Sequence, residues 1–102
     1  MYRASDEVTE RPWLIRLEQI AASLSIDPET VSLAAELYLS ELPIADRSKP
    51  VVLAASCYTA CLIMGEERSQ GAVADAFNVS RLSIQKRWKS QLAEIGLSPP
   101  DW

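Results

Sequence analysis

The sequence predicts an all-α fold of five helices, the last two of which form a helix-turn-helix. Glycine occurs only three times in 102 residues, and no segment shows the apolar–polar alternation that a half-buried strand needs. Capping residues, prolines and glycines divide the chain into helical segments. The chain is long enough to bury one modest core and too short for two, and its composition, 48% hydrophobic and 24% charged, is typical of a globular domain.

The first two helices are expected at about residues 10–24 and 28–42. In the first, apolar residues recur at i, i+4, i+7, i+8 and i+11, and a proline is tolerated in the opening turn. These apolar residues are Trp13, Leu17, Ile20, Ala21 and Leu24. The second helix begins with Asp27 as N-cap and Pro28 at the first helical position, and Pro43 stops it. Its inward face is expected to comprise Val31, Ala34, Ala35, Tyr38 and Leu42.

The third helix is expected to start after Ser48 and run to Met64, with a glycine at the C-terminal cap position. It is apolar almost all round, which predicts a central helix that the others surround. Cys57 and Cys61 share one face of it. Because the chain has no histidine and no further cysteine, these two cannot complete a four-ligand zinc site. We interpret them as buried packing residues, with a redox pair as the alternative.

The helix-turn-helix is predicted over residues 69–95. Ser69 and Ser80 would cap helices at about 70–77 and 81–95, and the separation of three residues is typical of this motif. Ala74 occupies the position that must be small, and Asn78 occupies the left-handed turn position. The residues expected to pack the two helices together are Val73, Phe77, Val79 and Ile84. The residues expected on the inward face of the last helix are Ile84, Trp88, Gln91 and Ile95, with Gly96 at its end.

Charge is distributed unevenly along this acidic chain, whose net charge is −4. Residues 1–46 carry three basic against nine acidic residues, a net charge of −6, whereas residues 47–102 carry seven against five, a net charge of +2. Four of the ten basic residues fall within residues 81–89, where there is no acid. This local patch predicts that the last helix faces a polyanion.

The patch and the motif together predict binding to double-stranded DNA, with the last helix in the major groove. Arg81 and Lys86 are candidates to bind guanine and Gln85 to bind adenine, while the backbone would be contacted by neighbouring polar residues. The predicted DNA-binding residues are Ser69, Gln70, Ser80, Arg81, Ser83, Gln85, Lys86, Arg87 and Lys89. The alternative is that these cations are the solvated face of an amphipathic helix.

Catalysis has little support in the sequence. There is no histidine, no glycine-rich phosphate loop and no serine or cysteine with a recognisable base partner, so we expect no enzyme, no cofactor and no metal. The expected organisation is an N-terminal extension (1–9), one helical domain (10–96) and a C-terminal tail (97–102). With no recognisable secretory signal and no apolar run long enough to span a bilayer, a cytoplasmic location without membrane contact is expected.

Residues 47–92 resemble a cyclin-like repeat of archaeal transcription factor B, the counterpart of eukaryotic TFIIB. The shared features are Arg-Ser before an alanine-rich helix, the Tyr-x-x-Cys at Tyr58, a short basic link, and a helix-turn-helix with Val-Ser and with Ile84 four residues before Trp88. The helices from Pro12 to Leu42 fit the first two of the repeat's five. The resemblance therefore implies a cyclin-like five-helix fold over about residues 10–95.

The resemblance also implies a function in transcription. In that family a zinc ribbon precedes two such repeats, the repeats hold the TATA-binding protein (TBP) on DNA, and the second helix-turn-helix reads DNA beside the TATA box. Here there is one repeat and no ribbon, so we expect a stand-alone DNA-binding regulator or an excised domain. The alternative is a protein-interaction module that binds TBP or another transcription protein. Because one helix-turn-helix covers few base pairs, a homodimer or a partner is also expected.

Overall fold

The computed structural model describes residues 8–96, and this part of the chain contains five α-helices of eight or more residues, one short 3-10 helix and no strand. Val8 and Thr9 are also helical. The predicted C-terminal tail, and the predicted N-terminal extension up to residue 7, lie outside the described residues. The elements are α2 (Arg11–Ser23), α3 (Pro28–Ser40), η1 (Asp46–Ser48), α4 (Lys49–Ile63), α5 (Gln70–Phe77) and α6 (Arg81–Glu94). The predicted all-α fold is thus confirmed.

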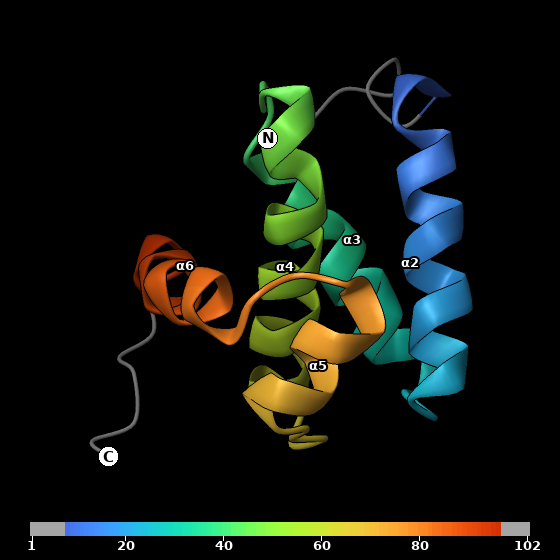
Figure 1. Ribbon diagram of the computed structural model, residues 1–102, viewed down its shortest axis with the longest axis vertical. Helices are drawn as coiled ribbons and strands as arrows, with labels where there is room; N and C mark the ends of the chain where they lie inside the picture. The colour runs from blue at the N-terminus through green and yellow to red at the C-terminus, as the bar shows by residue number, and fades with distance from the viewer. Residues whose placement is uncertain (1–7, 97–102) are drawn as a thin grey trace.

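Helix α4 is the centre of the fold, as its apolar composition predicted. The other helices surround it, with α2 and α6 on opposite sides, α3 behind and α5 across its C-terminal end in the view of Figure 1. Every residue from Val52 to Cys61 is consequently buried. Cys57 and Cys61 lie within this stretch as free thiols, and the hydrogen bond with Cys61, together with burial, raises the pKa of Cys57. Their interpretation as buried packing residues is confirmed.

The turn between α5 and α6 follows the predicted local chemistry. Ser69 Oγ accepts a hydrogen bond from the Ala72 N–H at 3.0 Å, and Ser80 Oγ accepts one from the Ser83 N–H at 3.1 Å. Asn78 adopts the left-handed conformation, with φ 58° and ψ 46°. Buried side chains hold the two helices together, and Val79 packs partly buried against the core. The buried side chains at this contact are Val73, Ala74, Phe77 and Ile84.

Two details differ from the sequence prediction. Ile95, expected to face inward, is 46% exposed, because α6 ends at Glu94 and Leu92, four residues after Trp88, takes the inward place. Helix α3 ends at Ser40 rather than at residue 42, although the side chain of Leu42 still packs against the core. None of the helices described within residues 8–96 is long and apolar enough to cross a membrane.

The start of α3 is held by a carboxylate from a distant part of the chain. Asp27 is at the N-cap, as predicted, but its side chain makes no capping hydrogen bond. Its N–H instead donates to both carboxylate oxygens of Glu66, at 3.2 and 3.1 Å. Thr30 Oγ1 donates to Glu66 at 2.5 Å, and Arg68 lies 3.9 Å from it. The Thr30 hydrogen bond lowers the pKa of Glu66 below its ordinary value of 4.5.

We therefore expect stability to fall on the acid side of pH 4.5, and Glu66 to cause part of that fall. Because the pKa of Glu66 is lower in the folded than in the unfolded chain, its stabilisation is complete above the unfolded value and is lost as the pH falls through the folded value. Urea unfolding across this range should give a flatter acid limb for Glu66→Gln than for the wild type. Glu67→Gln is the matched control, since that carboxylate makes no hydrogen bond within residues 8–96. An equally steep limb in Glu66→Gln would contradict the prediction.

Candidate nucleic-acid interface

One face of α6 is fixed against the core, and this determines which residues face solvent. Ile84, Trp88 and Leu92 are buried at successive i, i+4 positions. The Trp88 ring packs edge-on against Tyr58 of α4, with ring centroids 5.6 Å apart and an interplanar angle of 73°. The rotation of α6 about its own axis is therefore set by an aromatic contact with the central helix.

A buried polar network fixes the position of α6 along α4. Gln91 Oε1 accepts a hydrogen bond from Thr59 Oγ1 at 2.9 Å, and Gln91 Nε2 donates to Ser56 Oγ at 2.9 Å. The same amide donates to Glu41, whose carboxylate lies 3.9 Å from Arg87 Nη1. A network in which each buried group has a partner favours one arrangement of the two helices. Gln91, predicted to face inward, thus has a defined function in positioning the helix.

The residues of α6 that are not buried divide among an outer face and two flanks. Successive residues of an α-helix are rotated by about 100°, so residues four apart lie on one side. Arg81 and Gln85 lie on the flank toward α5, whereas Ser83 and Arg87 lie on the opposite flank, toward the N-terminal end of α4. The outer face between these flanks carries Leu82, Lys86 and Lys89, all of them exposed.

The first flank opens onto a shallow groove of about 370 Å³, which we name the α5 groove. Gln70 Nε2 lies 3.5 Å from the Tyr58 hydroxyl within it, and the stem of Arg81 passes close to Gly71 at the start of α5. The residues that line the groove are Tyr58, Glu67, Ser69, Gln70, Arg81 and Gln85. Four of the nine predicted DNA-binding residues therefore meet here, although they come from two helices.

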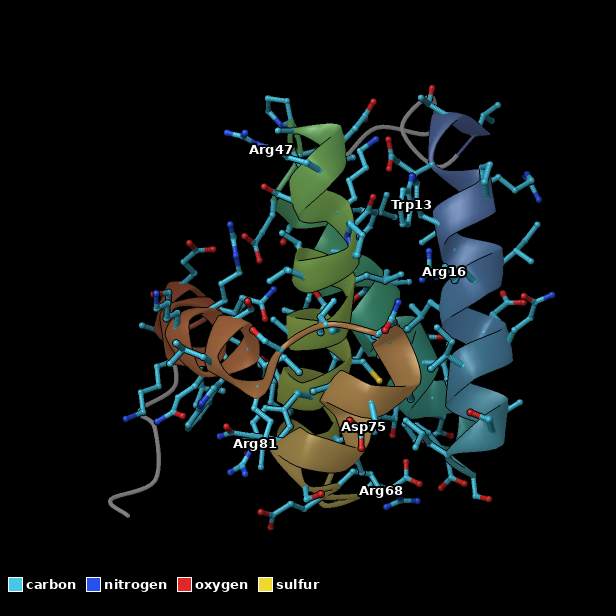
Figure 2. The ribbon with its side chains drawn as sticks, in the orientation of Figure 1. Trp13, Arg16, Arg47, Arg68, Asp75 and Arg81 are labelled. Carbon is cyan, nitrogen blue, oxygen red and sulfur yellow. The ribbon has the colours of Figure 1, made fainter. Side chains whose placement is uncertain are left out.

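The second flank opens onto a groove of about 310 Å³, which we name the α4 groove. Its lining residues are Arg47, Ser48, Val51, Ser83, Lys86 and Arg87. Three of these were predicted DNA-binding residues, whereas Arg47 and Ser48 were not. Arg47 and Arg81 both lie on the side of the molecule that α6 occupies (Figure 2). The Arg-Ser pair was visible in the sequence, but nothing in its spacing indicated that it would lie beside α6.

The cations of this surface differ in how far they are neutralised. Within residues 8–96, Arg47, Arg81 and Lys86 form no ion pair, whereas Arg87 pairs with Glu41. Lys89 Nζ lies 5.6 Å from the centroid of the Trp88 ring. The positive charges available to an anion are thus mainly those of Arg47, Arg81, Lys86 and Lys89, none of which has an ion-pair partner within residues 8–96.

The remaining predicted residues have structural contacts of their own. Ser80 Oγ both caps α6 and lies 2.7 Å from Ser83 Oγ, and Ser69 Oγ caps α5. Toward its C-terminal end, α6 borders a third groove of about 440 Å³ that includes the carboxylates of Glu41 and Glu94. The surface is therefore most positive along the first two turns of α6.

An all-α domain with four helices around one buried central helix is the class of structure that these observations define. The model of the family described as the transcription factor TFIIB repeat matches residues 16–94. The chain belongs to this family, and the predicted cyclin-like fold is confirmed with it. The protein is thus a transcription-related cyclin-like module. A comparison with curated proteins finds no match.

Proposed function

We propose that the protein is a DNA-binding transcription regulator that inserts α6 into the major groove of double-stranded DNA. The observation that carries the proposal is a group of exposed cations without acidic partners. They lie on the first turns of α6 and beside it. An α-helix fits the major groove, and the N-terminal residues of a recognition helix are those that approach base edges. The proposal gives the protein no enzymatic activity.

The side chains divide between base reading and backbone contact. Lys86 on the outer face, with Arg81 and Gln85 beside it, is proposed to read bases, since these residues belong to the first two turns and are exposed. Ser69, Gln70, Ser83 and Lys89 are proposed to contact phosphate or sugar, and Ser80 to hold the start of the helix. We assign Arg87 a minor part in backbone contact, because Glu41 already pairs with it.

The test is a fluorescence titration at moderate salt with a duplex selected by the protein from a random pool. We expect Arg81→Ala and Lys86→Ala each to weaken binding about tenfold or more, because a good base contact contributes about 1–3 kcal/mol of discrimination. Arg11→Ala, which removes a charge from the exposed face of α2 on the far side of α4, should bind like the wild type. The proposal is wrong if the wild type binds no duplex, or if both α6 variants bind as well as the wild type. The stoichiometry of the same titration distinguishes one chain per duplex from a homodimer.

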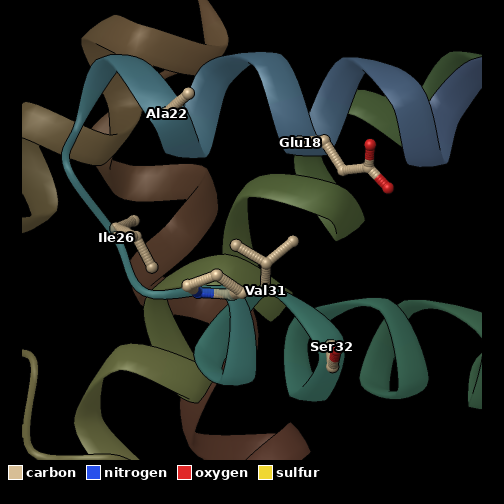
Figure 3. A pocket seen from close by; sticks show the side chains of 6 residues that line it. Glu18, Ala22, Ile26, Val31 and Ser32 are labelled. Carbon is tan, nitrogen blue, oxygen red and sulfur yellow. The ribbon is translucent and has the colours of Figure 1, made fainter.

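A second candidate function is a protein-interaction module for TBP or another transcription protein. The observation that favours it is a pocket of about 320 Å³ between α2 and the start of α3, on the side away from α6 (Figure 3). Ala22, Ile26 and Val31 give it an apolar wall, and Glu18 lies at one end. Such a pocket suits an apolar side chain of a partner protein.

A binding assay with purified TBP separates the two functions. Nuclease-resistant binding to TBP that Val31→Asp abolishes, together with no binding to any selected duplex, would favour the protein-interaction module. Val31→Asp places a charge in the pocket without altering α6, so a DNA-binding regulator should retain its affinity for duplex in this variant.

A further inference from the structure

The α4 groove differs from the other grooves beside α6 in that no carboxylate lines it. The α5 groove includes Glu67, and the groove toward the C-terminal end of α6 includes Glu41 and Glu94. The α4 groove is lined instead by three cationic side chains, two hydroxyl groups and one valine. On a chain with more acidic than basic residues, this is the groove with the greatest excess of positive charge among the three.

Two of its cations come from separate elements and are free to bind a ligand. Arg47 belongs to η1 and Lys86 to α6, and neither forms an ion pair within residues 8–96. Arg87 is held by Glu41, so its charge is partly neutralised. The hydroxyl of Ser48 makes no capping hydrogen bond, which leaves it available to an acceptor oxygen. The guanidinium of Arg47 and the hydroxyl of Ser48 are donors that a phosphate group binds, and Lys86, which is proposed to read bases, adds positive charge at the edge of the groove.

The α4 groove is placed so that one strand of a duplex bound by α6 would run along it. The α4 groove and the α5 groove lie on opposite flanks of α6. An α-helix with its side chains is about 10–12 Å across, and the major groove is about 12 Å wide. A helix that fills the major groove therefore has one phosphate strand along each flank.

We infer that the α4 groove binds a backbone phosphate of the DNA strand opposite to the strand that the α5 groove faces, with Arg47 as its main contact. The inference rests on the proposed function and extends it to a residue outside the predicted helix-turn-helix. Arg47 approaches from the start of the central helix, so the contact would tie the cyclin-like core, and not just α6, to the DNA. It would position the helix without reading sequence.

The test compares Arg47→Gln with Arg11→Gln, a variant matched in charge on α2, on the opposite side of the molecule (Figure 1). Each lost phosphate contact should reduce the slope of log affinity against log salt by about 0.9. We expect this reduction in Arg47→Gln and no change in Arg11→Gln. The ratio of wild-type to Arg47→Gln affinity should then fall about 3-fold between roughly 50 and 200 mM salt. The preferred duplex sequence should be unchanged.

A chemical probe locates the phosphate itself. A duplex with a single methylphosphonate, scanned along both strands, should show one position at which wild-type affinity falls and Arg47→Gln affinity does not. Equal salt slopes for wild type and Arg47→Gln, or the same methylphosphonate profile for both, would overturn the inference and leave the major-groove proposal intact if the duplex still binds. Failure of the wild type to bind any duplex would instead refute the proposed function.

Discussion

Trp88→Ala is expected to lower the free energy of unfolding by about 3–5 kcal/mol, in line with truncation of other buried tryptophans. The Trp88 side chain is 1% exposed, lies at the centre of the α4–α6 contact, and packs edge-on against Tyr58. Removing it leaves a cavity that neighbouring backbone cannot fill without moving α6. A domain of this size has a total stability of about 5–15 kcal/mol, so the loss is a large part of it.

Urea unfolding monitored by circular dichroism gives the measurement, because the signal then does not depend on the removed tryptophan. Trp88→Phe is the control, since it keeps an aromatic ring against Tyr58 and should cost clearly less than alanine. If alanine and phenylalanine cost the same small amount, the ring contact does not hold α6. Under the proposed function, both variants should lose affinity for duplex only as far as α6 loses its fixed position.

Local sequence chemistry was enough to predict where most helices begin and end. Asp27 and Pro28 start α3, Ser69 and Ser80 start the last two helices, and the left-handed Asn78 ends α5. These signals act between residues a few positions apart, so they can be read without knowing the fold. The central place of α4 was predictable for a related reason, because a helix that is apolar all round must be covered on every side.

Contacts between distant segments could not be predicted in the same way. Nothing in the spacing of Glu66 indicates that it binds the amide of Asp27, and nothing places Arg47 beside Lys86. Ile95 has the right spacing to face inward, yet α6 ends one residue before it. The spacing of apolar residues predicts which side of a helix is buried. It does not predict how far along the helix the neighbouring helices cover that side.

The acidity of the chain and the positive charge beside α6 belong to different parts of the surface. Exposed acids of the N-terminal half lie on α2 and α3, among them Glu18, Glu29 and Glu36. Helix α6 is on the other side of α4 from α2 (Figure 1). A duplex approaching the first two turns of α6 would therefore meet the basic residues first, and α2 would face away, although Glu41 at the end of α3 lies beside Arg87. Net charge alone is a poor guide to binding for a molecule divided in this way.

Glu10→Ala is the other substitution with a large expected effect, a loss of about 3–5 kcal/mol in the free energy of unfolding. Glu10 is 4% exposed and precedes α2. It accepts a hydrogen bond from the Tyr38 hydroxyl at 2.5 Å and pairs with Lys49 Nζ at 2.9 Å, so it joins the start of α2 to α3 and α4. Removing its carboxylate leaves a mostly buried ammonium and a buried hydroxyl without this partner.

The contacts of Glu10 also predict how stability changes with pH. The hydrogen bond to Glu10 raises the pKa of Lys49 above its ordinary value of 10.5, and burial, with Glu10, raises the pKa of Tyr38 above 10.0. For groups whose pKa is higher in the folded chain, the stabilisation is complete below the unfolded value and is lost as the pH rises through the folded value. Wild-type stability should therefore fall at alkaline pH, and Glu10→Gln should weaken that fall.

A triple replacement separates the ion pair from simple packing at the same place. In Glu10→Leu combined with Lys49→Met and Tyr38→Phe, the three buried polar side chains become apolar together, and such replacement of a buried pair is often close to neutral. The remaining partner of Lys49, Asp46, is exposed to solvent. We expect urea unfolding to show this variant much closer to the wild type than Glu10→Ala. Because leucine keeps the bulk at position 10, an equal loss in both variants would mean that the polar contacts of Glu10 themselves stabilise the fold. If only Glu10→Ala is unstable, its loss comes from the ammonium and hydroxyl left without this partner and from the missing bulk, and apolar contacts can replace the polar ones at the start of α2.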